Sequence, residues 1–339
     1  MKKKLDQSDN FIHLKPLPIL GKSGYKHGMS GLLVAKKHSY SVIKDVAVGG
    51  DAPKDLIRLY EYGCGRKTNF NGWPIYIAKL GHKWYPCESI TEQLISDIGR
   101  WLGFLLADSK LCVLGGQIRF LSKYFLSRNK EQLYHGANLY AGYLNDEQFV
   151  DEVELAQQTQ SFFTVNFTKE TLSHFFKDTK EELFARFMEM LFFDALVGNN
   201  DRHMYNWGVI RDLFGIKNAK YAPIYDSARG LLWNYTEKKI DNILNSGQTK
   251  LSIESYCNAS RPKIGVEGKS KINHFTLIEV HKEYFKTLDL VKNSLKPEVL
   301  DQVLENIDKN YKTLLSNNRR LLIKDILRYR VEVIRNTLI

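Results

Sequence analysis

Short runs in which apolar and polar residues alternate occupy the first part of the chain and predict β-strands. The runs are 32–35, 40–43, 75–80 and 117–123. Gly49-Gly50 predicts a turn between the second and third runs. Between the last two strands, residues 91–106 place apolar side chains at helical spacing and predict one helix. The amino-terminal region is therefore expected to be a small mixed β-sheet with a helix.

Farther along, the apolar spacing becomes mainly helical, ending in helices over 288–339. A helical run that includes Phe184, Phe187 and Leu191 leads to a short polar loop. Residues 207–211 and 220–224 predict a β-hairpin with its turn near 215–218. Residues 259–271, which contain glycines and a proline, predict a mobile loop.

The polar loop after the helical run carries candidate chemistry. Residues 198–208 read Gly-Asn-Asn-Asp-Arg-His-Met-Tyr-Asn-Trp-Gly, and residues 223–226 read Pro-Ile-Tyr-Asp. Asp201 can accept the proton of a hydroxyl nucleophile, while Asn206 and Asp226 can supply oxygen ligands to magnesium. A helix, a polar loop and an apolar strand in this order place such side chains at a cleft. The pattern predicts a phosphoryl-transfer site.

Each of these residues has a simpler interpretation when it is taken alone. Asn, Asp and Gly in succession are typical of turns, and Asp-x-His also occurs in metallohydrolases. No second His or Cys lies at a zinc-like spacing from His203. We therefore expect His203 to brace the catalytic loop by hydrogen bonding, with a role as metal ligand as the alternative.

The order of these motifs resembles that of the HipA-like serine/threonine kinases, bacterial toxin kinases with a protein-kinase-like fold. The family pattern Gly-Asn-x-Asp-x-His-x-x-Asn, then Pro-x-Tyr-Asp, is matched at 198–206 and 223–226. The resemblance covers roughly residues 60 to 230. It implies an α+β fold of two lobes, a small mixed β-sheet lobe at 1–125 and a larger, mainly helical lobe at 126–339.

The resemblance also implies residues that bind ATP. Lys79 looks like the strand lysine that holds the phosphates, and Glu92 looks like the helix glutamate that orients it. Glycines of the phosphate-covering loop let backbone N–H groups approach phosphate oxygens. The residues that resemble this loop are Gly63, Gly65, Arg66, Lys67 and Thr68. The adenine-contacting hinge would follow 118–124, with Ser122 and Tyr124 as the expected contacts.

The activity implied by the resemblance is ATP- and Mg²⁺-dependent phosphorylation of Ser or Thr in a cellular protein. It further implies a toxin of a toxin–antitoxin pair, with an antitoxin partner and a translation component such as an aminoacyl-tRNA synthetase as substrate. Asp201-Arg202-His203 with Asn206 also matches the phosphatidylinositol kinases, so a lipid kinase is an alternative. The second alternative is a catalytically silent, basic scaffold protein. The complete set of candidate catalytic residues argues against it.

Composition adds an electrostatic prediction. The net charge is +11, and residues 309–336 hold eight Lys and Arg against two acids. The spacing of Leu315, Leu322, Ile326, Tyr329 and Val333 in this segment predicts an amphipathic helix whose cationic face is solvated. Direct contact with nucleic acid is the weaker alternative, because no recognised nucleic-acid module accompanies the charge.

Apolar residues make up 43% of the chain, which is sufficient for a sizeable core. No apolar run approaches the roughly 18 residues that a membrane span requires. Four cysteines without paired spacing favour a reduced, cytoplasmic setting.

Self-modification is expected to differ from that of the family. HipA-like kinases commonly phosphorylate a Ser seven or five residues before the loop lysine, and these positions before Lys67 are Tyr60 and Tyr62. A Tyr hydroxyl extends several ångströms farther from its backbone, and misplacement by about 1 Å can cost roughly 100-fold in rate. We expect no self-phosphorylation at these tyrosines, and Thr68 is the nearest other hydroxyl.

Overall fold

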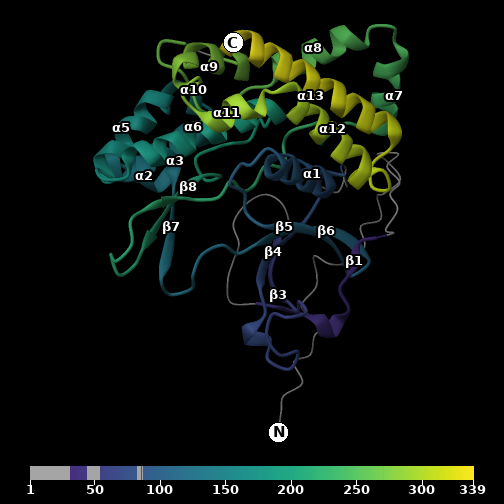
Figure 1. Cartoon of the computed structure of the whole chain (residues 1–339). Coiled ribbons are helices and arrows are strands. Elements are labelled where there is room, and N and C mark those ends of the chain that lie inside the picture. Colours follow the sequence, from purple (N-terminus) through teal and green to yellow (C-terminus); the bar gives the residue numbers. More distant parts are fainter. Residues whose placement is uncertain (1–30, 44–53, 82–84, 86, 270) are drawn as a thin grey trace.

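The computed structural model describes residues 31–43, 54–81, 85, 87–269 and 271–339. Figure 1 shows a sheet at the amino-terminal end, a larger body of helices above it, and helix α1 between the two. The fold is therefore α+β with a small sheet lobe and a larger helical lobe, as the sequence predicts. The boundary at residue 125 stays a prediction.

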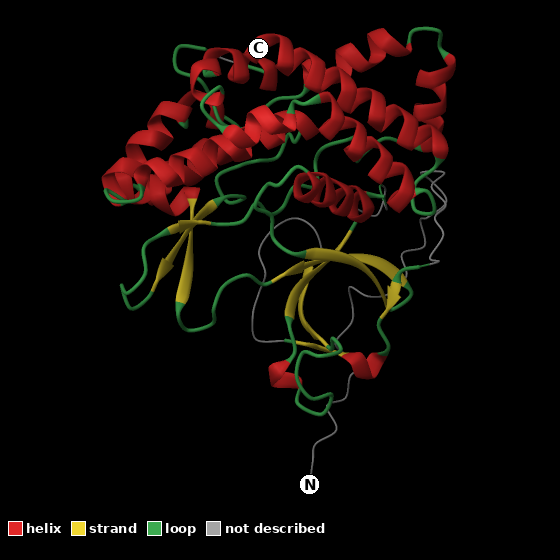
Figure 2. Cartoon of the chain, in the orientation of Figure 1, coloured by secondary structure: helices red, strands yellow, loops and turns green. Residues whose placement is uncertain are grey.

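Six strands form the curled sheet of the small lobe (Figure 2). Their order is β1-β5-β6-β4-β3-β2, with β1 parallel to β5 and the other neighbours antiparallel. The strands are β1 (Leu33–Val34), β2 (Tyr40–Val42), β3 (Lys54–Leu59), β4 (Ile75–Leu80), β5 (Ser109–Leu114) and β6 (Gln117–Lys123), with a 3-10 turn, η2 (Lys37–Ser39), before β2 and another, η3 (Phe70–Gly72), before β4.

Alternation along the strands buries both faces of this sheet. Successive side chains of a strand point to opposite faces. Val113 and Phe120 belong to the large core that includes α1 (Glu88–Trp101), whereas Cys112 and Leu121 belong to a second cluster on the other face. Helix α1 packs on β5 and β6 and so faces the sheet beside β4.

The helical lobe surrounds one buried helix and carries a second, three-stranded sheet in the order β7-β8-β9. These strands are β7 (Glu131–His135), β8 (Gly208–Asp212) and β9 (Lys220–Tyr221). The helices are α2 (Gly136–Leu144), α3 (Glu147–Leu155), α4 (Thr159–Phe162), α5 (Val165–Phe175), α6 (Lys180–Val197), α7 (Glu237–Asn245), α8 (Thr249–Ala259), α9 (His274–Val280), α10 (Lys282–Phe285), α11 (Asp289–Ser294), α12 (Pro297–Tyr311) and α13 (Asn317–Leu338).

Helix α6 is the centre of this lobe. From Met190 to Val197 every side chain is buried, because α5, α9, α10, α11 and α13 pack around the helix. A helix that is apolar on all sides requires such a buried position. Its last turn delivers the chain directly to the polar loop at 199–206. Among the helices that the structure describes, none is both long and apolar enough to cross a membrane.

Most of the predicted elements are confirmed, with shifted ends. Strands 75–80 and 117–123 have the predicted bounds, and the hairpin at 207–224 is present with a shorter second strand. The predicted helix 91–106 instead spans Glu88–Trp101. It ends early because Gly103 adopts φ +87, while its N–H donates to Arg100 O and that of Phe104 to Gly99 O. These two bonds form a Schellman cap.

The prediction of a mobile loop at 259–271 is contradicted at 264–266, which is packed against the helical lobe, whereas Glu267, Gly268, Lys269 and Lys271 are exposed. Ile264 and Val266 are buried. The backbone of Gly265 pairs with the segment that enters α5, through Gly265 N to Phe163 O and Val165 N to Gly265 O. Glycine is needed for this close approach, because a Cβ at 265 would lie 1.7 Å from Gln160 O.

The predicted solvated cationic face at 309–336 is present only in part, at Lys309, Lys312 and Arg328, which are exposed. Arg319 and Arg330 of α13 are fully buried. Arg320 and Lys324 both pair with Asp308 of α12. Much of this charge is therefore neutralised or hydrogen-bonded inside the helical lobe, which weakens the case for nucleic-acid contact on charge alone.

Gly265→Ala is expected to destabilise the fold by about 2 kcal/mol or more, because the added methyl group overlaps backbone atoms that cannot move independently. Urea denaturation followed by circular dichroism measures the change. Gly72→Ala is the matched control, since its Cβ would meet nothing closer than Asn69 Nδ2 at 3.7 Å. Equal stability of the two variants would contradict the packing assigned to Gly265.

Candidate active site

A cavity of about 610 Å³ lies between the two lobes. Its wall from the small lobe includes Lys54, Lys79 and, from α1, Glu92. Its wall from the helical lobe includes the loop after α6 and the turn after β9, with Asp201 and Asp226. A cavity of this size suits a ligand as large as a nucleotide.

Lys79 is the centre of a buried charge cluster in this cavity. Its Nζ donates to Glu92 Oε1 at 2.6 Å and to Asp226 Oδ1 at 2.9 Å. Lys54 reaches the second oxygen of Asp226 at 3.4 Å. The expected pairing of Lys79 with Glu92 is therefore present, and one carboxylate from the helical lobe joins it.

Burial and charge set the protonation of this cluster. Burial acts to raise the pKa of Asp226, but Lys79 and Lys54 hold it well below its usual range. Burial also raises the pKa of Glu92, to about 7, against the opposing effect of Lys79. The pKa of Lys79 itself is raised, since its two carboxylate partners outweigh its burial. Lys79 and Asp226 thus form a charged pair, and Glu92 is the more weakly acidic carboxyl group.

Asp226 has an unusual backbone. Its φ is +53, in the left-handed region that few non-glycine residues occupy. The strain is typical of residues that the surrounding structure holds for function. Here the next turn is tied down by Ser227 Oγ, which accepts from Arg202 at 2.6 Å.

Arg202 joins the three segments that build the helical side of the site. Its guanidinium forms a two-pronged ion pair with Asp194 of α6, at 2.8 and 2.9 Å. It also donates to the carbonyl oxygens of Asn206 and Tyr225. Both Asp194 and Arg202 are buried. The loop at 199–206 and the turn at Asp226 are therefore held against the end of α6.

Asn206 is oriented within this loop by its own side chain. Its Nδ2 donates to Asp201 O at 2.8 Å, so the amide oxygen is the end available as a metal ligand. The loop also contacts α9, where His274 Nε2 lies 2.9 Å from Asn199 O. Burial, together with nearby Arg330, lowers the pKa of His274 to about 3. The neutral imidazole therefore donates to the loop and does not add charge to it.

His203 contacts the loop and α3. Its Nδ1 lies 3.3 Å from the backbone N of Tyr205 and 3.5 Å from Glu154 Oε1. These contacts fit the expected bracing role of His203 in the catalytic site, and its alternative role as a metal ligand stays a prediction. Tyr225 Oη donates to Tyr205 O at 3.1 Å and lies 2.9 Å from His135 Nδ1, which ties the same loop to β7.

The structure contradicts the assignment of the phosphate-covering loop. In the antiparallel pair β3–β4, Lys54 lies opposite Lys79 at the cavity end, and Arg58 lies opposite Ile75 at the other end. At ~3.3 Å per residue these ends are about 13 Å apart. The misassigned residues all lie beyond the distal end, exposed and outside the cavity lining: Gly63, Gly65, Arg66, Lys67 and Thr68.

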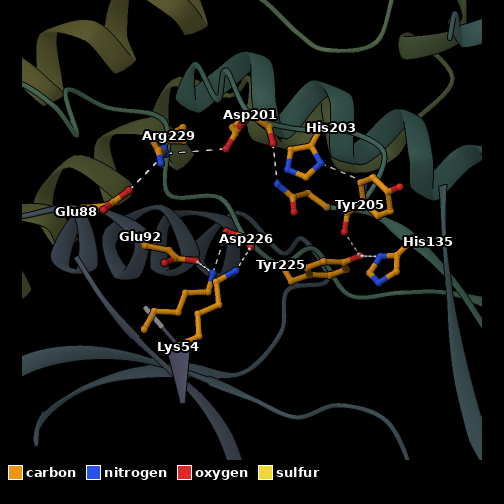
Figure 3. A network of polar contacts seen from close by, with 12 residues as sticks. Lys54, Glu88, Glu92, His135, Asp201, His203, Tyr205, Tyr225, Asp226 and Arg229 are labelled. Atoms are coloured by element: carbon orange, nitrogen blue, oxygen red, sulfur yellow. Dashed lines mark hydrogen bonds and ion pairs between the residues drawn. The ribbon is translucent and has the colours of Figure 1, made fainter. Parts of the chain in front are cut away.

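Lys54 is the site residue that the sequence interpretation missed. The available signal was a lysine shortly after Gly49-Gly50, at the start of an apolar strand. These glycines lie outside the described residues. Arg229 was missed as well. It follows Asp226 by three positions and lies between Glu88 and Asp201 in Figure 3.

Both expected hinge residues line the cavity. Ser122 lies between Ile77 and Ser109 in the sheet. The N–H of Tyr124 donates to Ile75 O at 2.8 Å. A contact from Tyr124 to adenine would therefore come from its carbonyl group or ring, and not from this amide.

The chain resembles one known protein family and two proteins of known structure. The family model described as HipA-like C-terminal domain matches residues 46–311. The kinase CtkA of Helicobacter pylori, described as proinflammatory, shares the fold with a TM-score of 0.66 and 17% identity, over 90% of this chain and 97% of CtkA. HipA of Shewanella oneidensis MR-1, solved in a complex of HipA, HipB and operator DNA, aligns with a TM-score of 0.47 and 12% identity, over 78% and 60% of the two chains. No curated protein matches the chain.

Arg202→Met is expected to lower the free energy of unfolding by about 3–5 kcal/mol, because it leaves Asp194 buried without its cation. Guanidinium denaturation measures the loss. Arg328→Met is the matched control, since Arg328 forms an exposed pair with Asp325 and its removal should cost less than about 1 kcal/mol. The double variant Asp194→Leu/Arg202→Met should regain part of the loss. A loss below that of the control would refute the assigned role of Arg202.

Proposed function

The chain belongs to the HipA-like family, and we propose that it is an ATP- and Mg²⁺-dependent protein kinase that phosphorylates Ser or Thr. The observation that carries the proposal is the meeting of Lys79, Glu92 and Asp226 in one cavity with Asp201 and Asn206. A phosphate-binding lysine, its orienting glutamate, metal-binding oxygens and a base are the parts that phosphoryl transfer requires.

The proposed reaction uses the two sides of the cavity differently. An acceptor hydroxyl oxygen forms a bond to the γ-phosphorus, and the bond from that phosphorus to the bridging oxygen of ADP breaks. Asp201 takes the hydroxyl proton. Lys79 and Lys54 hold phosphate oxygens by charge and hydrogen bonds. Asp201 suits the role of base, because its side chain is 40% exposed to an incoming acceptor.

The residues present fit magnesium. Asp226 offers a carboxylate and Asn206 an amide oxygen, both in the cavity lining. Mg²⁺ prefers such oxygens and takes its remaining ligands from water and phosphates. Among the described residues no cluster of three His, Cys, Asp or Glu side chains forms a metal cage by itself. Bound there, the ion would neutralise phosphate charge.

The substrate and partners are proposed on the resemblance alone. They are a cellular protein such as an aminoacyl-tRNA synthetase as target and an antitoxin as partner, which would make this kinase the toxin of a pair. The intact charge cluster favours an enzyme over a silent scaffold. A lipid kinase is the remaining alternative. Labelled ATP added to cell lysate, with and without lipid vesicles, separates protein from lipid acceptors.

Mg–ATP at about 100 times its dissociation constant should stabilise the chain by roughly 2.7 kcal/mol, which raises the melting temperature visibly. Asp201→Asn should keep this shift but reduce phosphoryl transfer about 10²–10⁴-fold, the usual contribution of a positioned base. Asp226→Asn should weaken binding of Mg–ATP, because it removes a charged metal ligand.

The control for these variants is ATP with a chelator in place of Mg²⁺. Without the metal, Asp226→Asn should bind ATP no more weakly than the unaltered chain does. A melting curve that Mg–ATP leaves unmoved, while metal alone shifts it, would favour a metallohydrolase. Equal loss of Mg–ATP binding in both variants would contradict the separate roles of base and metal ligand.

Self-phosphorylation is expected to leave Tyr60, Tyr62 and Thr68 unmodified. All three lie in the connection at the distal end of β3–β4, away from the cavity, so Thr68 is not a hydroxyl near the site, contrary to the sequence-based expectation. Counting seven and five residues back from Lys54 reaches Ala47 and Gly49, which carry no hydroxyl and lie outside the described residues. Phosphopeptide mapping after incubation with Mg–ATP tests this. Stoichiometric phosphate on any of the three, at a rate independent of protein concentration, would disprove it.

A further inference from the structure

Arg229 lines the cavity and has no role in the proposed reaction as it is assigned to Lys54, Lys79, Asp201, Asn206 and Asp226. Its Nε lies 3.4 Å from Glu88 Oε1 and 4.0 Å from Asp201 Oδ2 (Figure 3). Its guanidinium lies over the ring of Trp233, 4.1 Å from the ring centre. The side chain is 29% exposed. An aromatic face thus holds a guanidinium beside the proposed base, at a position that a ligand in the cavity can reach.

The cations of the cavity fall into two groups. Lys54 and Lys79 both contact Asp226. Arg229 lies on the other side, at Asp201. Lys123, also in the lining, pairs instead with Asp108. Among the lysines and arginines of the described lining, Arg229 is therefore the one beside Asp201, at the side where the acceptor hydroxyl would enter.

The proposed reaction needs a cation on that side. In the transition state the charge of the transferred group spreads over its three equatorial oxygens. The carboxylate of Asp201 must lie close to this group and repels it. Lys54 and Lys79 already compensate the negative charge of Asp226. A guanidinium offers several donors in one plane and matches phosphoryl oxygens better than an ammonium group does.

We propose that Arg229 is a catalytic residue that leaves Glu88 and binds the transferred phosphoryl group in the transition state. The inference rests on the proposed kinase function and adds the residue that stabilises the moving group. Arg229 forms and breaks no covalent bond. It donates hydrogen bonds to the equatorial oxygens while the phosphorus–acceptor bond forms and the phosphorus–ADP bond breaks.

A purely structural role would have different consequences. The contacts of Arg229 link Glu88, in the first turn of α1, to the loop that carries Asp201. If they served only to hold the lobes together, removal of Arg229 would weaken nucleotide binding and stability as a whole. A catalytic role predicts instead a loss confined to the transition state, since interactions stronger there than in the ground state raise kcat.

Binding of Mg–ADP with and without aluminium fluoride, measured by calorimetry, separates these roles. Aluminium fluoride beside ADP mimics the transferred group, so it should tighten binding of Mg–ADP to the unaltered chain about 10-fold or more. Arg229→Met keeps an apolar stem against Trp233 and should bind Mg–ADP alone within about twofold of the unaltered chain, while most of the tightening is lost. Arg229→Lys should retain an intermediate part of this tightening, because lysine keeps the positive charge but lacks the planar set of donors of a guanidinium.

Kinetics of ATP hydrolysis, with water as acceptor, provide the second readout. Arg229→Met should lower kcat roughly 100-fold with KM for ATP little changed. Arg186→Met is the matched control, since Arg186 pairs with Glu189 on α6 and does not line the cavity. It should behave as the unaltered chain in both assays.

The outcomes distinguish this inference from the function on which it rests. If Mg–ADP does not bind the unaltered chain, the kinase proposal and the role of Arg229 both fall. Two results would overturn the role of Arg229 alone, provided that Mg–ADP binds. In the first, aluminium fluoride tightens binding of Mg–ADP equally in the unaltered chain and in Arg229→Met. In the second, it tightens binding in neither of these proteins. A matched loss of Mg–ADP affinity and melting temperature in Arg229→Met also overturns that role, because that result assigns the residue to the structure.

Discussion

The buried ion pair between Asp194 and Arg202 is the interaction on which the geometry of this site depends. All five N–H groups of the guanidinium have acceptors, two on Asp194 and the others on Asn206 O, Tyr225 O and Ser227 Oγ. A buried charge that is fully hydrogen-bonded avoids most of the penalty of its desolvation, whereas a partly satisfied one is costly. The segments that carry the proposed base and the two proposed metal ligands are therefore held in position by one side chain.

The small lobe contributes a complementary constraint, because Lys79 is shared between two carboxylates of different acidity. Asp226 is held ionised by two lysines, while burial leaves Glu92 the more weakly acidic group. A phosphate group that enters the cavity would draw both lysines from Asp226, and a magnesium ion would take over the compensation of that carboxylate. The same cluster thus links the lobes in this structure and, under the proposed function, would bind phosphate and metal. Glu92, which contacts Lys79 at 2.6 Å, would keep Lys79 in place during this exchange.

Elements whose signals are local were predicted well from the sequence, and the placement of residues by strand pairing was not. Strand 75–80 and the loop with Asp201 and Asn206 follow from alternation and from a helix that ends in a glycine. The phosphate loop was misassigned because glycines predict a turn but do not show at which end of a hairpin it lies. The antiparallel register puts Lys54, and not Lys67, beside Lys79. The segment that contains Gly265 was misjudged for a similar reason, since its pairing partner is distant in sequence.

Net charge was misleading for a related reason, because it counts residues without regard to burial. Arg330 of α13 donates to Ala195 O in the last turn of α6, and Arg335 donates to Leu295 O at the end of α11. Arg319 binds Glu237 and two backbone carbonyl groups. Cations near helix carboxyl ends satisfy carbonyl groups that lack partners within the helix. Several arginines of the last helix therefore stabilise other helices, among them α6, whose end carries the loop with Asp201. These arginines are not free to attract a polyanion, although Lys309, Lys312 and Arg328 of the same region are exposed.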